Sequence, residues 1–184
     1  DGPLTVVLIA RMLRDKGVGE FVESARQLKP RFPEVRFLLV GSPDSGNPTS
    51  FSISDLNSWQ REECVEWIGH GSEVANILKQ SHIVCLPSYR EGLPKSLIEA
   101  ASAGRPIVTT NVPGCREVVT DGENGFLVPP RDSVALADVI QKLLINPSMR
   151  KAMGAAGRKR AVEEFSSAVI IRQTLDLYES ILIP

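Results

Sequence analysis

Two cations lie close together near the beginning of the chain, where they could bind an anion. Arg11 directly follows the apolar segment 4–10, and Lys16 comes five residues later, immediately before Gly17. A helix is expected to begin after Gly17, and the unpaired N–H groups of a helix N-terminus favour a bound anion. Arg11 and Lys16 could therefore hold a polyphosphate, although their spacing fits two solvated surface cations equally well.

Two carboxylates lie eight residues apart in the middle of the chain. Glu91 belongs to a loop-like segment with Gly92 and Pro94, and Glu99 lies in the helix expected over 95–103. Pro94 is predicted at the first position of that helix, where proline is favoured. Two glutamates at this spacing also occur by chance in many helices, so the pair alone indicates a charged strand-end site without specifying its ligand.

Several familiar site types are absent from the sequence. It has no GxxxxGK[ST] phosphate loop and no GxGxxG after the first apolar segment, which argues against the usual ATPase and dehydrogenase sites. It has no Asp-x-Asp pair to hold a divalent metal on a nucleotide diphosphate. His70, His82 and three widely spaced cysteines fit neither a zinc site nor a disulfide framework. We therefore expect no metal, no cofactor and a reducing, cytoplasmic setting.

The composition is that of one globular domain. The chain has 184 residues, of which 42% are apolar. Lys and Arg total 21 against 22 Asp and Glu, so the net charge is −1 and no basic field exists to attract nucleic acid. No apolar run approaches the roughly 18 residues of a membrane span. We expect a single domain over 1–184, and the missing initiator Met predicts that it belongs to a longer protein.

Apolar, β-branched segments alternate with amphipathic segments along the chain. The segment LTVVLIA at 4–10 is typical of a strand buried on both faces of a parallel sheet. Phe21, Ala25 and Leu28 then recur at helical spacing between Gly17 and Pro30. Further strands are expected over 35–40, 65–68, 83–86, 107–110 and 125–128, and further helices over 55–63, 73–80, 95–103, 134–144, 149–165 and 169–181.

This alternation predicts an α/β fold, a doubly wound parallel sheet of about six strands with helices on both faces. In such a sheet, ligands bind beyond the carboxyl ends of the strands. Arg11 and Lys16 follow the first expected strand, and Glu91 follows the fourth. The candidate residues are therefore expected at the edge of the sheet where ligands bind.

Three segments in this order resemble a known enzyme family. They are ARMLRDKG at 10–17, REGLPKSLIEAASAGRPIVTT at 90–110 and GCREVVTDGENGFLVPP at 114–130. Together they are similar to the carboxyl-terminal domain of retaining, GT-B-fold glycosyltransferases of family 4, and the resemblance covers essentially the whole chain. It implies a domain that binds a nucleotide-sugar donor. It also implies a separate amino-terminal domain, absent from this chain, that binds the acceptor.

The resemblance assigns roles to individual charged residues. Arg11 and Lys16 match the cations that hold the donor diphosphate and stabilise the leaving nucleotide in place of a metal. Glu91 matches the glutamate that accepts hydrogen bonds from hydroxyl groups of the donor sugar. Glu99 matches the glutamate that accepts from the ribose. Both roles suit a carboxylate, which can accept from two neighbouring hydroxyl groups at once.

Backbone groups complete the site that the resemblance implies. Those expected near the sugar and the phosphates belong to Gly92, Leu93, Lys95 and Ser96. The base, with uracil favoured over guanine, is expected near Gly69, His70 and Gly71, although His70 could also be an ordinary exposed loop histidine. The segment EGLPKSLIEA is most similar to bacterial transferases that build surface polysaccharides. This implies a glycan or lipid-linked acceptor at the cytoplasmic face of the membrane.

Two other functions remain open from the sequence. Nucleotide-sugar 2-epimerases share the architecture, but they need acid and base groups that the sequence does not identify. A noncatalytic nucleotide-binding module is the second alternative, and the joint presence of Arg11, Lys16, Glu91 and Glu99 argues against it. Since the acceptor domain is absent, we expect this chain alone to bind a donor without transferring its sugar.

Overall fold

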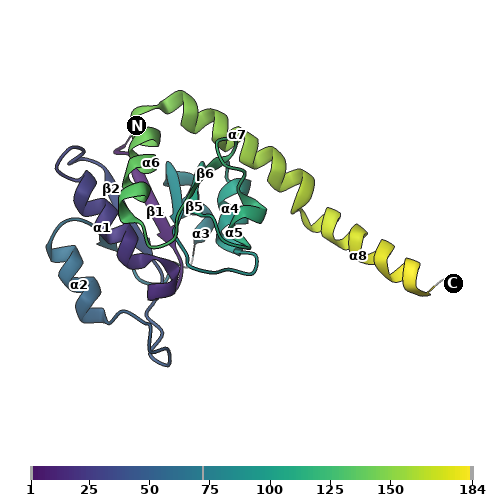
Figure 1. The fold of residues 1–184 in the computed structure, drawn as a ribbon, viewed down its shortest axis with the longest axis horizontal. Helices are drawn as coiled ribbons and strands as arrows, with labels where there is room; N and C mark the ends of the chain where they lie inside the picture. Colours follow the sequence, from purple (N-terminus) through teal and green to yellow (C-terminus); the bar gives the residue numbers. More distant parts are fainter. Residues whose placement is uncertain (1, 72, 183–184) are drawn as a thin grey trace.

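The computed structural model describes residues 2–71 and 73–182 and confirms the expected α/β architecture. Six parallel strands form one sheet in the order β3-β2-β1-β4-β5-β6, with helices on both faces (Figure 1). The strands are β1 (Thr5–Ile9), β2 (Arg36–Val40), β3 (Glu66–Trp67), β4 (Ile83–Leu86), β5 (Ile107–Thr110) and β6 (Gly125–Val128). The helices are the 3-10 turn η1 (Arg14–Lys16), α1 (Val18–Leu28), α2 (Ile53–Arg61), α3 (Val74–Gln80), α4 (Lys95–Ser102), α5 (Cys115–Val118), α6 (Ser133–Ile145), α7 (Pro147–Glu164) and α8 (Ser167–Leu182).

The order of the strands reverses between β1 and β4. β1 pairs in parallel with β2 on one side and with β4 on the other. The chain runs outward from β1 to β3 and then returns to add β4, β5 and β6 on the opposite side. The loops after β1 and β4 therefore lead to helices on opposite faces of the sheet, α1 on one and α4 on the other, and open α/β sheets bind ligands at such a switch point.

Alternate residues of β1 belong to two separate hydrophobic cores. Val6 and Leu8 pack on the face covered by α1, α2 and α6. On this face the rings of Phe21 and Phe37 pack edge to face, with their centres 5.9 Å apart. Val7 packs on the other face, against α4 and α5. Burial on both faces explains why the strand is a continuous apolar run. The loops at its carboxyl end are thus carried by a rigid, fully packed support.

Two boundaries differ from the expected ones for local reasons. α2 begins at Ile53, two residues earlier than predicted, because Ser52 caps it. The Ser52 Oγ accepts from the N–H of Asp55 at 3.1 Å, and the Asp55 carboxylate accepts from the N–H of Ser52 at 2.8 Å. β3 contains only Glu66 and Trp67 of the four residues predicted, because this edge strand pairs with β2 alone.

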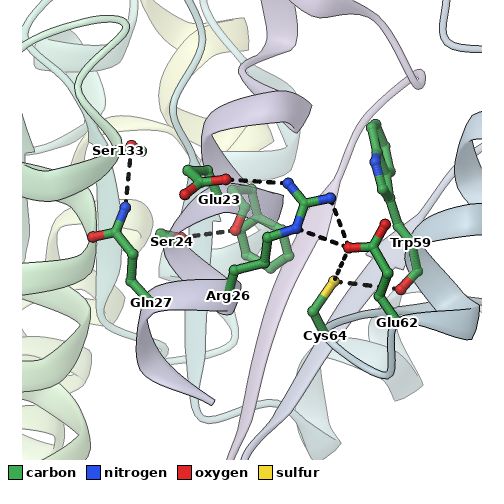
Figure 2. Close-up of polar contacts among 9 residues, drawn as sticks. Glu23, Ser24, Arg26, Gln27, Trp59, Glu62, Cys64 and Ser133 are labelled. Atoms are coloured by element: carbon green, nitrogen blue, oxygen red, sulfur yellow. Dashed lines mark hydrogen bonds and ion pairs between the residues drawn. The ribbon is translucent and has the colours of Figure 1, made fainter. Parts of the chain in front are cut away.

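Arg26 on α1 fixes the turn that follows α2 (Figure 2). Its guanidinium lies 2.7 Å from the carboxylate of Glu62 and 3.1 Å from that of Glu23. The Cys64 thiol donates to the Trp59 carbonyl at 3.3 Å, and burial raises the pKa of that thiol, so that it stays a neutral donor. The Arg26–Glu62 contact links α1 to the turn after α2, and the Cys64–Trp59 contact closes that turn onto the end of α2.

The last helix, α8, extends away from the rest of the molecule (Figure 1). None of its described residues is buried, and one set of them exposes large apolar side chains. These are Ile170, Ile171, Leu175, Leu177, Tyr178, Ile181 and Leu182. Within the described part of the chain, no helix is both long enough and apolar enough to cross a membrane. α8 is an amphipathic helix whose apolar side is uncovered in this chain.

We expect α8 to make the chain associate at high concentration, and its deletion to abolish association with little effect on folding. Exposed apolar patches larger than about 400 Å² promote association, whereas side chains that are not buried add little to the free energy of unfolding. Light scattering over a concentration series and thermal unfolding compare the chain with a variant that ends at Phe165. A drop in the unfolding midpoint of more than about 3 °C on deletion would contradict this expectation.

Candidate functional site

Lys16 and Glu91 form an ion pair that joins the loop after β1 to the loop after β4. The Nζ of Lys16 lies 2.7 Å from Oε1 of Glu91, and the two side chains are only 19% and 12% exposed. The residues are 75 positions apart in the sequence. A pair so far withdrawn from water needs both partners, because removal of one leaves an unpaired charge. The ammonium retains two further N–H bonds that it can donate to an anion.

The backbone carbonyl of Asp15 holds the two loops together. It accepts hydrogen bonds from the N–H of Tyr89 at 2.8 Å and from the hydroxyl of Ser88 at 2.9 Å. Gly17 packs so closely on Pro87 that a Cβ at position 17 would lie 2.1 Å from the Pro87 carbonyl oxygen. These contacts place η1 against the loop after β4 and so bring Lys16 to Glu91.

We expect Gly17→Ala to lower the free energy of unfolding by more than Gly122→Ala does. Both glycines have a left-handed backbone, with φ of 72° and 76°, which costs an alanine about 1 kcal/mol. An added Cβ meets no described atom within 4 Å at position 122 but collides with Pro87 at position 17. Urea unfolding should give losses of about 1 kcal/mol for Gly122→Ala and about 3 kcal/mol for Gly17→Ala. Equal losses would show that the two loops are not tightly packed.

The loop after β5 also packs on the loop that carries Glu91. Gly114 has a φ of 82°, and a Cβ on it would lie 2.3 Å from the carbonyl oxygen of Gly92 and 2.7 Å from that of Glu91. Gly92 itself has no described atom within 4 Å of the position that a Cβ would take. The space beside Gly92 is therefore open to a ligand, while its backbone is supported from Gly114.

The first two N–H groups of α4 belong to Lys95 and Ser96. Neither has an acceptor among the described residues. The prediction that Pro94 is the first helical residue is wrong: its ψ of 110° is extended, so that it caps the helix instead. The Lys95 ammonium lies 3.5 Å from the Glu99 carboxylate one turn later, with side chains 88% and 36% exposed. Leu93, just before the helix, is exposed.

The start of α1 offers a second set of such groups. The N–H groups of Val18 and Gly19 have no acceptor within residues 2–71 and 73–182. Gly17 caps this helix with its left-handed backbone. Lys16 thus directly precedes the cap of α1, at whose N-terminus the dipole and these N–H groups stabilise an anion.

A cavity of about 460 Å³ lies beyond the carboxyl ends of β1 and β2. Arg11, His70 and Gly71 line it, together with Asp44 from the loop after β2. The guanidinium of Arg11 donates to the Asp44 carboxylate at 2.7 Å, and the Arg11 side chain is 61% exposed. An ion pair this exposed is weak, so Arg11 can exchange Asp44 for another anion.

A second cavity, of about 410 Å³, lies between α3 and α4 and includes Glu99. Val74 lines both cavities, which are therefore neighbours. Gly69, two residues after β3, has a φ of 70°, and its carbonyl accepts from the N–H of Gly41 at 2.7 Å. The structure thus brings together three groups of predicted residues: Lys16 with Glu91, Arg11 with His70 and Gly71, and Glu99 with Lys95.

The sequence interpretation missed a cluster around Tyr89. The Tyr89 hydroxyl donates to Oε1 of Glu20 at 2.5 Å, and the Arg131 guanidinium lies 4.7 Å from the centre of its ring. Burial, reinforced by the Glu20 carboxylate, raises the pKa of Tyr89 to about 12. The phenol therefore stays a neutral donor and anchors the residue two positions before Glu91. Its partners, Glu20 in α1 and Arg131 in the loop after β6, are distant in the sequence, so no local motif indicates these contacts.

Comparison with families of known proteins shows where this arrangement belongs. Residues 1–160 match the family model described as glycosyl transferases group 1. The chain belongs to this family. The family expected from the sequence is thereby confirmed.

Two curated bacterial glycosyl transferases match nearly the whole chain. The capsular polysaccharide biosynthesis glycosyltransferase CapM of Staphylococcus aureus is 32% identical, over 95% of this chain and 45% of its own length. The N,N'-diacetylbacillosaminyl-diphospho-undecaprenol alpha-1,3-N-acetylgalactosaminyltransferase of Campylobacter jejuni is 33% identical, over 96% of this chain and 45% of its own length. The chain thus spans about half the length of the curated relatives it matches.

A solved structure shares the fold. The crystal structure of Anabaena Alr3699/HepE in complex with UDP is similar with a TM-score of 0.88 at 23% identity, over 97% of this chain and 49% of that one. The chain therefore has the Rossmann-like architecture of one half of the GT-B fold, as the sequence predicted.

Proposed function

We propose that residues 1–184 are the carboxyl-terminal domain of a retaining glycosyltransferase and bind its nucleotide-sugar donor. The observation that carries this proposal is the ion pair of Lys16 and Glu91 at the switch point of the sheet. The helices that follow these two residues, α1 and α4, each begin with N–H groups that have no acceptor in the described part of the chain. Cations and free N–H groups suit a diphosphate, and a carboxylate suits sugar hydroxyl groups. The UDP bound to the Anabaena protein supports a UDP-sugar as the donor.

In this proposal Lys16 and Arg11 hold the diphosphate and act as the catalytic cations. Transfer breaks the bond between the anomeric carbon and the diphosphate oxygen, and the electron pair of that bond stays on the oxygen. Negative charge therefore grows on the diphosphate as the bond lengthens. Cations and helix N–H groups that are already in place stabilise this charge more in the transition state than in the ground state.

Glu91 acts on the sugar side of the same bond. Its contact with Lys16 orients the carboxylate before a donor arrives. Hydrogen bonds from sugar hydroxyl groups to Glu91 would hold the ring while positive charge develops on it. The backbone N–H groups expected to border the sugar and the phosphates belong to Gly92, Leu93, Lys95 and Ser96.

The nucleoside is proposed to occupy the two neighbouring cavities. Glu99 would accept hydrogen bonds from the ribose hydroxyl groups, in the cavity between α3 and α4. The base would lie in the cavity lined by His70 and Gly71, at the end of the loop that begins with Gly69. Binding of the diphosphate then requires Arg11 to turn from Asp44 toward the phosphates.

The acceptor is proposed to bind to a separate amino-terminal domain of a longer protein. The names of the relatives, which refer to capsular polysaccharide and to diphospho-undecaprenol, favour a glycan or lipid-linked acceptor. Such a protein would act in the cytoplasm, at the inner face of the membrane. The chain alone should bind a donor without transferring its sugar.

Calorimetric titration of the chain with UDP, GDP and ADP tests the proposed function. We expect binding of UDP that is tighter than that of the other two nucleotides, because the sequence resemblance and the Anabaena complex both point to uracil. Failure of all three to bind would overturn the proposal. Sugar transfer by the purified chain would show instead that no second domain is required.

We expect EDTA to leave the affinity for UDP unchanged within about twofold. Lys16, Arg11 and the N-terminus of α1 supply the positive charge that a metal would otherwise bring. Among the described residues, no three His, Cys, Asp or Glu side chains are grouped so that they could hold a metal ion. The measurement is the same titration with EDTA and with added Mg²⁺, and a loss of affinity on chelation would contradict this expectation.

A further inference from the structure

A cavity at the opposite edge of the sheet from the proposed donor site is lined mainly by basic residues. Its volume is about 290 Å³. The amino-terminal ends of β4 and β5 and the first turn of α7 meet there. The lining residues are His82, Gly104, Arg105, Pro106, Pro147, Arg150 and Lys151. Parallel strands place their amino ends at one edge of the sheet and their carboxyl ends at the other. This cavity therefore lies apart from the proposed donor site, and it shares no lining residue with the two cavities proposed for the nucleoside.

Among the described residues, no carboxylate neutralises the positive charge of this cavity. Within residues 2–71 and 73–182, none of Arg105, Arg150 and Lys151 forms a salt bridge with a carboxylate. Arg26 and Arg36, in contrast, each pair with a glutamate. No Asp or Glu is among the residues that line the cavity. Three cations that share one concave site attract an anion from solution.

The two arginines are held in place by main-chain carbonyls. Arg150 donates to the carbonyl of Leu144 near the end of α6 at 2.8 Å, and Nη2 of Arg105 donates to the carbonyl of Lys79 near the end of α3 at 3.1 Å. The Nε of Arg105 is buried and has no acceptor among the described residues. A buried donor without a partner costs free energy, so the Arg105 guanidinium keeps its positive charge beside the cavity without a compensating acceptor at Nε.

His82 contributes a further donor. Its Nδ1 accepts from the N–H of Thr5 at 3.1 Å, so the neutral ring carries its proton on Nε2. Burial lowers the pKa of His82, and the charges of Arg150 and Arg105 lower it further. An anion bound between these groups would oppose the two guanidinium charges and raise that pKa again.

We propose that this cavity binds a phosphoryl group, either of a free phosphate ester or of an acidic lipid headgroup. Guanidinium groups donate directed hydrogen bonds to the oxygens of a tetrahedral phosphoryl group. Lys151 is exposed and adds a positive charge at the rim of the cavity. A water molecule occupies about 30 Å³ in the liquid, so 290 Å³ accommodates one tetrahedral anion and the atoms attached to it. The site is independent of the proposed glycosyl transfer.

The chain has two histidines, which allow the two sites to be observed separately. His82 reports on this cavity and His70 on the proposed donor site. NMR titration of both imidazoles against pH, in sodium sulfate and in sodium chloride of equal ionic strength, measures their pKa values. We expect sulfate to raise the pKa of His82 by at least about 0.5 unit more than chloride does. Equal shifts in the two salts would mean general screening and would overturn the proposal.

Two matched lysine variants on α7 show whether the effect comes from the cavity. Lys151→Gln should remove at least about half of the shift specific to sulfate, because it deletes a charge at the rim. Lys159→Gln removes an exposed lysine outside the cavity and should leave the shift unchanged. Equal effects of the two substitutions would overturn the proposal. Arg105→Gln should abolish the shift, with the amide spectrum of each variant as the check of folding.

Sedimentation with vesicles separates the two sources of the phosphoryl group. Vesicles of phosphatidylcholine, with and without phosphatidic acid, are mixed with the chain and with the two lysine variants. Binding to phosphatidic acid that is weakened several-fold by Lys151→Gln, and not by Lys159→Gln, assigns the site to a lipid headgroup. A sulfate response at His82 without such vesicle binding assigns it to a free phosphate ester.

Discussion

Lys16→Met is expected to lower both the stability of the chain and its affinity for UDP. The substitution leaves the Glu91 carboxylate, 12% exposed, without its cation. Removing one partner of a buried ion pair costs about 3 to 5 kcal/mol of stability. We expect the lower value here, because both side chains keep some contact with solvent. The loss of one charge-assisted hydrogen bond to the diphosphate costs a further 1.5 to 3 kcal/mol in binding, or roughly ten- to hundred-fold in Kd. Urea unfolding and calorimetry measure the two effects.

The double variant Lys16→Met/Glu91→Gln separates these effects. It should regain most of the lost stability, because the neutral amide at position 91 no longer needs a cation. It should not regain affinity for UDP, because the diphosphate still lacks the ammonium. Glu91→Gln alone completes the double-mutant cycle. If the double variant bound UDP like the unmodified chain, Lys16 would act only by holding Glu91, and its proposed contact with the diphosphate would be wrong.

The fold could be predicted from the sequence wherever turn-forming residues frame an apolar segment. β5 and β6 agree with prediction residue for residue, since Pro106 precedes the first and both Gly122 and Pro129 flank the second. β3 could not be predicted as well, because its length depends on the one strand with which it pairs. The start of α2 was missed although Ser52 and Asp55 form a recognisable capping box.

The types of the site residues could be predicted, but their contacts could not. The pairing of Lys16 with Glu91 depends on β4 returning to lie beside β1, and two apolar segments do not specify that they are neighbours. Asp44 lies in a loop whose composition shows no periodicity, so nothing marked it as the partner of Arg11. Such contacts belong to the topology of the sheet and are set by sequence-distant packing.

Glu99→Gln and Glu91→Gln are expected to affect UDP binding differently. If Glu99 accepts hydrogen bonds from the ribose, its replacement weakens UDP and a UDP-sugar alike, by about 1.5 to 3 kcal/mol. If Glu91 contacts only the sugar, its replacement leaves the Kd for UDP unchanged within about twofold. In a longer protein that carries the acceptor domain, Glu91→Gln should lower turnover, because contacts to the sugar matter most as positive charge develops on its ring.

Calorimetric titration of both variants with UDP decides between these roles, with Glu163→Gln as the control. Glu163 is exposed on α7 and lines neither of the two cavities proposed for the nucleoside, so its substitution tests the loss of a carboxylate charge alone. Equal losses of UDP affinity for Glu91→Gln and Glu99→Gln would contradict the assignment, as would a loss confined to Glu91→Gln. Either result would mean that the loop with Glu91 and the helix α4 approach the donor in a different register from the one that the resemblance implies.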